Sequence, residues 1–206
     1  MSQQDDIEYQ LDTLAIRTGH TRSFEGEHGE PIFLTSSFVY ENAAEAAAKF
    51  SGQEPGNIYS RFTNPTVAMF EKRLAALEGA ERAVATSTGM AAIMAVAMSY
   101  LKLGDHVICS RAVFGSTVSL FEKYVAKFGV SVDFVDLTDL AAWKNAIKPE
   151  TKLLFVESPS NPLSEIADIQ ALADIAHANG ALLAIDNSFC TPVLQQPIKF
   201  GADLVV

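Results

Sequence analysis

An acidic residue stands at the end of an apolar stretch that has the length of a strand. Residues 181–185 are Ala-Leu-Leu-Ala-Ile, and Asp186 follows them. Strands of a parallel α/β sheet are continuous apolar runs, and ligands bind beyond their carboxyl ends. A carboxylate in that place can hold a proton on the ring nitrogen of a cofactor, bind a ribose or ligate a metal ion. The other candidate residues favour the first of these roles.

A small polar turn leads into an apolar helix further upstream. Ser87 and Thr88 precede Gly89 and Met90. Unpaired backbone N–H groups at the start of a helix can bind a phosphate. Ordinary N-capping by either hydroxyl is the alternative explanation of the same residues. The turn matches neither the Walker loop nor the GxGxxG fingerprint.

Three further loops could contribute to a binding site. Arg61, next to Tyr59, could bind phosphate through two parallel hydrogen bonds, or it could be a solvated loop residue beside a packed tyrosine. Phe114 follows a predicted strand and could stack on a planar ligand, or belong to the core. Asn161 follows another predicted strand and could donate to a ligand oxygen, or simply form a turn before a proline.

A flat, phosphorylated ligand that contains nitrogen fits these features together, and pyridoxal phosphate fits them best. Its phosphate would bind at Gly89 and Met90, its ring under Phe114, and its pyridine nitrogen against Asp186. The carboxylate would raise the pKa of that nitrogen by opposite-charge attraction, so that the ring stays protonated. A protonated ring withdraws electrons from a neighbouring carbanion.

The elements that must position these residues alternate along the chain from about residue 80. Strands are expected at 82–86, 105–110, 130–135, 152–156 and 181–186 and from 202, and helices at 89–103, 116–128, 137–147 and 168–179. This alternation predicts an α/β fold with a mostly parallel, helix-covered sheet. Residues 1–60 lack it and are expected to form an arm, with at most a short helix at 43–48. Because the last strand has no helix after it, we expect the front part of a longer protein.

Composition narrows the class of protein. The 206 residues are 49% hydrophobic, which allows a large core, and their net charge of −10 argues against nucleic acid and anionic membranes as partners. No apolar run reaches membrane-spanning length, and the polar residues 1–10 do not form a signal peptide, so a cytoplasmic protein is expected. Cys109 and Cys190 are expected to be buried, reduced thiols in strand-like surroundings, and no metal site is expected.

Five short segments together resemble the Cys/Met-metabolism family of pyridoxal-phosphate enzymes. They are YSRFTNP at 59–65, STGMAAI at 87–93, ESPSNP at 157–162, DNSF at 186–189 and GAD at 201–203. This family includes cystathionine γ-synthase, the cystathionine lyases, methionine γ-lyase and the O-acylhomoserine sulfhydrylases. The resemblance implies the aminotransferase-like (fold type I) large domain over residues 61–206, incomplete and preceded by an intersubunit arm over 1–60.

The resemblance also implies roles for individual residues. Gly89 and Met90 would bind the phosphate through the backbone, Asp186 would pair with the pyridine nitrogen, and Asn161 would lie near the phenolic oxygen of the ring. In this family, the loop equivalent to 59–61 reaches the site of the neighbouring subunit. A homodimer would then be the smallest catalytic unit, usually paired into a homotetramer, with Tyr59 and Arg61 completing the phosphate site of the partner copy.

Two departures from the family pattern refine the expectation. Most relatives carry Tyr where this chain has Phe114, and Phe-Gly here looks like the O-succinylhomoserine sulfhydrylase branch. Methionine γ-lyases carry Cys where this chain has Ser116. The Schiff-base Lys of the family would lie beyond Val206, and the Arg that binds the substrate carboxylate would lie in a further C-terminal domain. We therefore expect the present residues alone to be inactive.

The predicted activity of the complete protein is γ-replacement on the small amino-acid substrate O-succinylhomoserine with sulfide, which gives homocysteine for methionine biosynthesis. Cystathionine γ-synthase and O-acetylhomoserine sulfhydrylase are alternatives that differ in the thiol or the acyl group. Two other classes stay open: a non-catalytic scaffold with the same fold, and a nucleotide-binding domain with Asp186 on a ribose. The absence of a Gly-rich fingerprint counts against the nucleotide.

Overall fold

The computed structural model describes residues 9–206, which divide into two compact units, one up to Ala85 and the other Thr86–Val206. The expectation about a signal peptide falls mainly on residues 1–8, outside the described part of the chain. Within residues 9–206, no helix combines the length and hydropathy needed to cross a bilayer. The predicted arm over residues 1–60 stays a prediction.

A five-stranded parallel sheet forms the centre of the second unit. Its strands are β1 (His106–Ser110), β2 (Ser131–Val135), β3 (Thr151–Glu157), β4 (Leu182–Asp186) and β5 (Leu204–Val205). The spatial order is β2-β1-β3-β4-β5, and every neighbouring pair runs parallel. The predicted parallel α/β sheet is thereby confirmed. The order turns back between β1 and β3, and binding crevices of such sheets form where the order reverses, outside the carboxyl ends of the strands.

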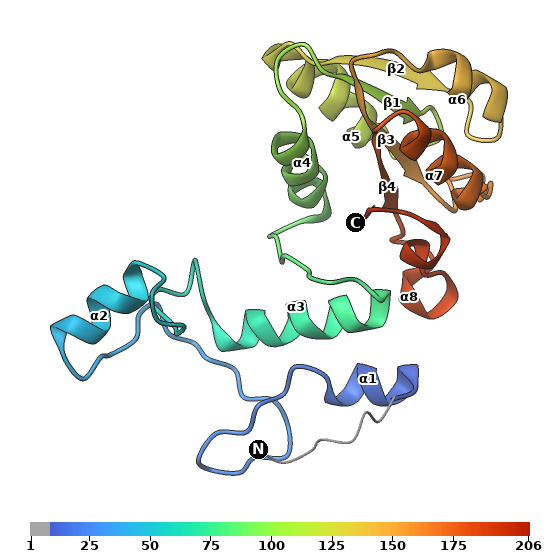
Figure 1. The fold of residues 1–206 in the computed structure, drawn as a ribbon. Coiled ribbons are helices and arrows are strands. Elements are labelled where there is room, and N and C mark those ends of the chain that lie inside the picture. Colours follow the sequence, from blue (N-terminus) through green and yellow to red (C-terminus); the bar gives the residue numbers. More distant parts are fainter. Residues whose placement is uncertain (1–8) are drawn as a thin grey trace. The chain divides into compact units, whose positions relative to one another are not determined.

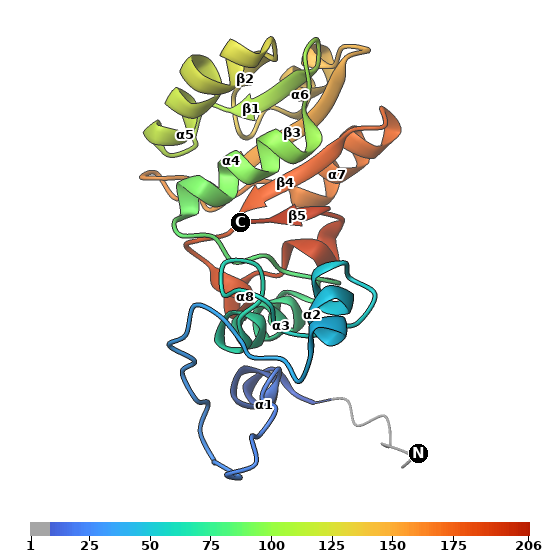
Figure 2. The same cartoon turned by 90° about the vertical axis from the view of Figure 1, so that its left-hand side faces the viewer.

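Helices cover both faces of this sheet (Figure 1). One side carries α4 (Gly89–Tyr100) and α5 (Gly115–Ser119), and the other carries α6 (Leu140–Ala146) and α7 (Ile169–Ala178). Figure 2 shows α4 running across the front of the strands. The strand side chains alternate between two cores: Val107, Phe155 and Ala184 pack toward α4 and α5, whereas Ile108, Leu154 and Ile185 pack toward α6 and α7. This period of two explains why the strands read as unbroken apolar runs.

Local signals set the ends of several elements as predicted. The side chain of Asp168 accepts a hydrogen bond from the Ala171 N–H and caps α7, and Gly180 just after it has a φ of 66°. The predicted helix 116–128 is present but not uniform, because α5 continues as a π-turn (Leu120–Tyr124) and a 3₁₀ turn (Val125–Phe128). This segment ends at Gly129, whose backbone φ is 77°.

The strand predicted at residues 82–86 is wrong, because the structure has irregular backbone there. The side chain of Val84 is 81% exposed instead of packed on a sheet. The amide of Ala85 donates to the carboxylate of Glu71 at 2.8 Å and not to a neighbouring strand. A short apolar run becomes a strand only where another strand offers a ladder of partners.

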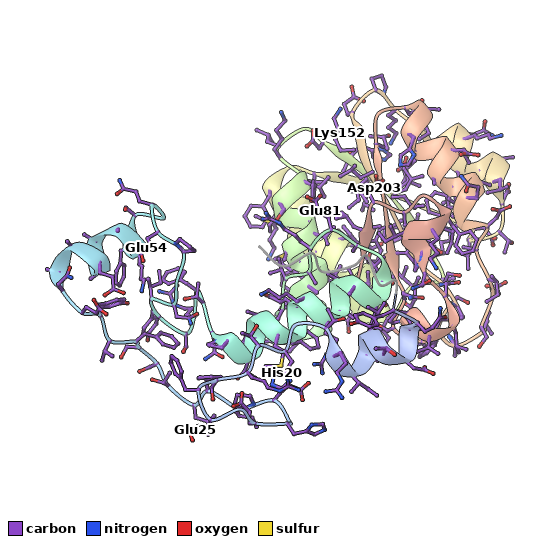
Figure 3. The ribbon with its side chains drawn as sticks, turned by 60° about the horizontal axis from the view of Figure 1, so that its bottom comes forward. His20, Glu25, Glu54, Glu81, Lys152 and Asp203 are labelled. Carbon is purple, nitrogen blue, oxygen red and sulfur yellow. The ribbon has the colours of Figure 1, made fainter. Side chains whose placement is uncertain are left out.

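The first unit contains α1 (Leu11–Arg17), α2 (Ala43–Phe50) and α3 (Pro65–Glu78). The helix α2 confirms the short helix expected at 43–48 and extends it to Phe50. Neither α1 nor α2 has a buried residue, so both lack a core face of their own. The loops of this unit carry exposed acids such as Glu25 and Glu54 (Figure 3).

The short strand β5 is held to β4 by a side chain as well as by the ladder. The carboxylate of Asp203 accepts a hydrogen bond from the Leu183 N–H at 2.8 Å and lies 3.0 Å from Nε2 of His177. The loop between these strands contains α8 (Thr191–Leu194) and a 3₁₀ turn, Pro197–Phe200.

A buried histidine links three strands at the opposite, amino-terminal edge of the sheet. His106 is fully buried, and its Nδ1 lies 2.8 Å from Oγ1 of Thr151. Its Nε2 lies 3.3 Å from Nζ of Lys148 and 3.3 Å from Oδ2 of Asp133. Burial, followed by the positive charge of Lys148, lowers the pKa of His106.

The two cysteines differ in burial and in the element that carries them. Cys109 is buried in β1 as predicted, and burial raises the pKa of its thiol. The expectation for Cys190 is wrong: this residue is only half-buried, and it lies in the turn before α8 and not in a strand. Its neighbours Phe189 and Val193 are also largely exposed.

Candidate active site

Two acidic residues end neighbouring strands at the carboxyl edge of the sheet. Glu157 is the last residue of β3 and Asp186 the last of β4, and the parallel register pairs them directly. Phe155 and Ala184, two residues earlier, pack toward α4 and α5. Because side chains alternate along a strand, both carboxylates lie on that same face. The predicted position of Asp186 at a strand end is confirmed.

One oxygen of Asp186 is anchored and the other is not. Oδ1 accepts hydrogen bonds from the backbone N–H of Ser188 at 3.1 Å and from its hydroxyl at 2.7 Å. Within residues 9–206 no donor reaches Oδ2, and the residue is 9% exposed. The carboxylate is therefore oriented by its own loop and has one oxygen available for a donor outside the described chain.

The neighbouring carboxylate is tied to a different loop. Oε2 of Glu157 accepts a hydrogen bond from the backbone N–H of Phe114 at 2.6 Å, although Phe114 follows β1 and lies 43 residues away in the sequence. Glu157 is 6% exposed. Burial raises the pKa of Glu157 and the nearby charge of Asp186 raises it further, against the opposing effect of the Phe114 N–H.

A hollow of about 540 Å³ opens beside Phe114. Met90, from the first turn of α4, lines it together with residues of α5 and its π-turn; the α5 side contributes Gly115, Ser116, Ser119, Leu120 and Tyr124. The ring of Phe114 is 50% exposed and so presents an aromatic surface to a ligand. π-turns inside helices often occur at functional sites.

The start of α4 offers free backbone donors. Oγ1 of Thr88 accepts from the Ala91 N–H and the carbonyl of Thr88 accepts from the Ala92 N–H. The amides of Gly89 and Met90 come before these and have no acceptor within the helix. A Cβ added at Gly89 would meet nothing within 4 Å, so open space adjoins these donors. An anion can approach this helix start closely.

Asn161 lies four residues after Glu157, half-buried in the turn that follows β3. The turn is braced by the loop after β4, because Nε2 of Gln195 donates to the carbonyl of Ser158 at 2.7 Å and to Oδ1 of Asn187 at 2.8 Å. The two loops beyond β3 and β4 are therefore one connected platform at the carboxyl edge of the sheet.

Tyr59 and Arg61 belong to the first unit, and the structure does not join them to these residues. Tyr59 forms an antiparallel bridge with Ser37. The guanidinium carbon of Arg61 lies 4.2 Å from the ring centroid of Phe62, and within residues 9–206 Arg61 takes part in no ion pair. An exposed, unpaired guanidinium suits a phosphate partner, and the role of this loop stays a prediction.

Sequence reasoning did not select Glu157 or Ser188 as site residues. The signal that identified Asp186, an apolar strand that stops at an acid, is equally present at Glu157. Ser188 carries the pattern of a hydroxyl two residues after an Asp, a spacing at which short polar side chains bond to one another locally. Only the strand register shows that the two acids are neighbours.

Comparison with known proteins supports one family over nearly the whole chain. The model of the family described as Cys/Met metabolism PLP-dependent enzyme matches residues 12–206. An O-succinylhomoserine sulfhydrylase of Pseudomonas aeruginosa is 66% identical over 95% of this chain and 49% of its own length. An L-methionine gamma-lyase of Fusobacterium nucleatum subsp. polymorphum is 42% identical over 96% of this chain and 50% of its own length.

Two solved structures resemble this chain over nearly all of its length. A crystal structure of metB from Corynebacterium glutamicum superposes with a TM-score of 0.89 at 35% identity, over 96% of this chain and 50% of that one. A putative O-acetylhomoserine (thiol)-lyase (metY) from Campylobacter jejuni, with N'-pyridoxyl-lysine-5'-monophosphate at position 205, superposes with a TM-score of 0.92 at 34% identity, over 96% and 49%. The chain thus spans about half the length of the relatives it matches. The chain belongs to the family of Cys/Met metabolism PLP-dependent enzymes.

Proposed function

We propose that the full-length protein is an O-succinylhomoserine sulfhydrylase, which replaces the γ-succinyloxy group of O-succinylhomoserine by sulfide and yields homocysteine. The 66% identity to a protein of that name, over 95% of this chain, supports the substrate. The observation that carries the chemistry is Asp186, anchored through Oδ1 and open at Oδ2, at the carboxyl end of β4. Such a carboxylate suits a protonated ring nitrogen.

The residues present fit pyridoxal phosphate. The ligand carries an anionic group, a flat ring and a basic nitrogen. The start of α4 offers unpaired N–H donors with open space at Gly89, Phe114 offers an exposed ring, and Asp186 offers a carboxylate oxygen without a donor among residues 9–206. When bound, the cofactor supplies an electron-withdrawing ring that stabilises negative charge developing on the substrate carbons.

The residues of the chain bind the cofactor and orient its ring. Gly89 and Met90 bind the phosphate through backbone N–H groups, as helix starts do. Phe114 stacks on one face of the ring and excludes water there. Asn161 donates to the phenolic oxygen. Asp186 keeps a proton on the ring nitrogen because an adjacent anion favours the cationic form, and Ser188 holds Asp186 in that orientation.

The partner that we propose is a second copy of the same protein. Tyr59 and Arg61 would reach across to the phosphate of the neighbouring subunit, with residues 1–60 as the intersubunit arm and residues 61–206 as part of the large domain. The exposed guanidinium of Arg61 supports this arrangement. A homodimer is then the smallest active unit and a homotetramer the assembled form, acting in the cytoplasm on small amino acids and not on nucleic acid or membranes.

The test supplies the purified full-length protein with O-succinylhomoserine or O-acetylhomoserine, each with sulfide or cysteine, and identifies the products by mass spectrometry. Homocysteine formed preferentially from the succinyl ester and sulfide supports the proposal. Cystathionine as the main product would identify a cystathionine γ-synthase instead. Preference for the acetyl ester would favour the activity named for the Campylobacter jejuni relative. No product from any pair would leave the scaffold alternative.

A further inference from the structure

We propose that Glu157 is a positioning residue that holds the Phe114 loop against the carboxyl end of β3, and thereby keeps the ring of Phe114 at the height of the cofactor site. This inference rests on the proposed function for its catalytic consequence. Its structural part, the tie between a strand end and a loop, stands on contacts within Thr86–Val206 alone.

The loop between β1 and α5, residues 111–114, is tied by hydrogen bonds at its start and at its end. At its start, the Arg111 N–H donates to the carbonyl of Val135 at 2.8 Å, and the Ala112 N–H donates to Oγ of Ser110 at 3.0 Å. At its end, the carbonyl of Phe114 accepts from the Thr117 N–H at 2.8 Å, as in any first helical turn. The second tie at this end is the short hydrogen bond from the Phe114 N–H to Glu157, the Glu157 tie.

The Glu157 tie is a strong hydrogen bond because its acceptor is charged. A carboxylate acceptor makes a shorter and stronger hydrogen bond than a carbonyl, and the 2.6 Å separation agrees with this. The bond is partly buried, and its acceptor residue, Glu157, is only 6% exposed, so water competes little for the carboxylate. The first residue of α5 follows Phe114 directly, so the tie also fixes where this helix begins.

The tie links two functional side chains through one residue. Glu157 pairs in register with Asp186, and neighbouring parallel strands lie only about 4.8 Å apart. Moving the Phe114 loop away from β3 therefore moves the stacking ring away from the carboxylate that meets the ring nitrogen. The alignment of the Phe114 ring with the Asp186 carboxylate matters, because a flat ligand must contact both at once.

Three variants of the full-length protein separate the effect of the hydrogen bond to the Phe114 N–H from the effect of the negative charge of Glu157. Glu157→Gln keeps a carbonyl oxygen that can accept from the Phe114 N–H and removes the negative charge. Glu157→Ala removes the acceptor. Glu150→Ala is the matched control, since Glu150 is an exposed acid before the opposite end of the same strand.

The first measurement is hydrogen exchange of the cofactor-free protein, followed by mass spectrometry of peptides covering residues 111–117. Glu157→Ala should speed exchange of these amides, whereas Glu157→Gln and the control should match the wild type. Unchanged exchange in Glu157→Ala would overturn the inference. This readout needs neither activity nor cofactor, so it is independent of the proposed function.

The second measurement is a double-mutant cycle on pyridoxal-phosphate affinity, with visible circular dichroism of the bound cofactor as a second signal. Glu157→Ala should weaken binding by about tenfold, the upper range for one aromatic stacking contact, and Glu157→Gln should restore most of it. In a Phe114→Ala background, Glu157→Ala should weaken pyridoxal-phosphate binding by less than about twofold, because Glu157 acts through the ring of Phe114. Equal losses in both backgrounds would overturn the inference.

The two proposals fail in different ways. A wild-type protein that binds no pyridoxal phosphate, combined with faster loop exchange in Glu157→Ala, would refute the proposed function and leave the positioning role in place. Normal sulfhydrylase activity in Glu157→Ala with unchanged loop exchange would refute the positioning role and leave the proposed function in place.

Discussion

Replacing Asp186 by Asn tests the electrostatic core of the proposed function. Asn has the same shape and keeps an oxygen that can accept from the Ser188 N–H and hydroxyl, so the loop after β4 should be retained. The change removes the negative charge and puts an NH2 donor in place of the other carboxylate oxygen. Ser188→Ala is the graded control, because it removes the 2.7 Å hydroxyl contact and leaves the backbone N–H in place.

The size of the effect follows from the environment of the carboxylate. At 9% exposure an effective dielectric constant of about 20 is appropriate, and two opposite charges about 4 Å apart then attract by about 4 kcal/mol. Since about 1.4 kcal/mol corresponds to a factor of ten, full loss of this attraction would cost about a thousandfold in turnover. Part of the loss is recovered by an amide contact, so we expect a fall in kcat of about 10²- to 10³-fold.

The assay measures homocysteine formation by the full-length protein at saturating pyridoxal phosphate, with bound cofactor quantified in parallel. Ser188→Ala should lose the hydrogen bond that orients Asp186, which is worth about 1 kcal/mol, and kcat should therefore fall about fivefold. A turnover of Asp186→Asn within about threefold of the wild type, with the cofactor fully bound, would refute the reasoning, because the charge would then not support the chemistry.

Four other outcomes are expected of the full-length protein. Arg61→Ala should weaken pyridoxal-phosphate binding, and mixing it with Asp186→Asn should restore some activity if the guanidinium acts across subunits; no recovery argues against the arm. The free energy of unfolding should fall as the pH drops below about 6.5, because the lowered pKa of His106 means that the unfolded chain binds the proton more readily, and His106→Asn should flatten this dependence in urea titrations at several pH values. Iodoacetamide should label half-buried Cys190 well before buried Cys109 in peptide maps of the native protein, and equal rates would contradict their burial. Trp143→Ala should destabilise the fold by about 3–5 kcal/mol, because this fully buried ring fills the core under α6, and a loss below 1 kcal/mol in denaturant melts would contradict that packing.

Much of the second unit could be predicted because its signals are local. The strand that ends at Asp186 is an unbroken apolar run, which is what a sheet covered on both faces requires. The helix 169–178 carries its own boundaries in an Asp cap and a Gly just beyond its end. These patterns act over a few residues and therefore do not depend on distant parts of the chain.

The wrong predictions concern features that depend on neighbours. Residues 82–86 have the composition of a strand but no ladder partner in the structure, and Val84 is exposed. Cys190 lies among apolar residues, but these form an exposed turn and not a strand. The π-turn after α5, whose Tyr124 lines the hollow, has no local signal in the sequence.

The amino-acid sequence by itself determined the family, the parallel α/β class and the acid that ends β4, because these depend on composition, short-range periodicity and contiguous motifs. Only the tertiary structure decided that β3 lies beside β4, and hence that Glu157 adjoins Asp186 and reaches the amide of Phe114. The pairing of β3 with β4, which are about 25 residues apart in the sequence, depends on how α7, the helix between them, packs on one face of the sheet. No local pattern of residues contains that choice.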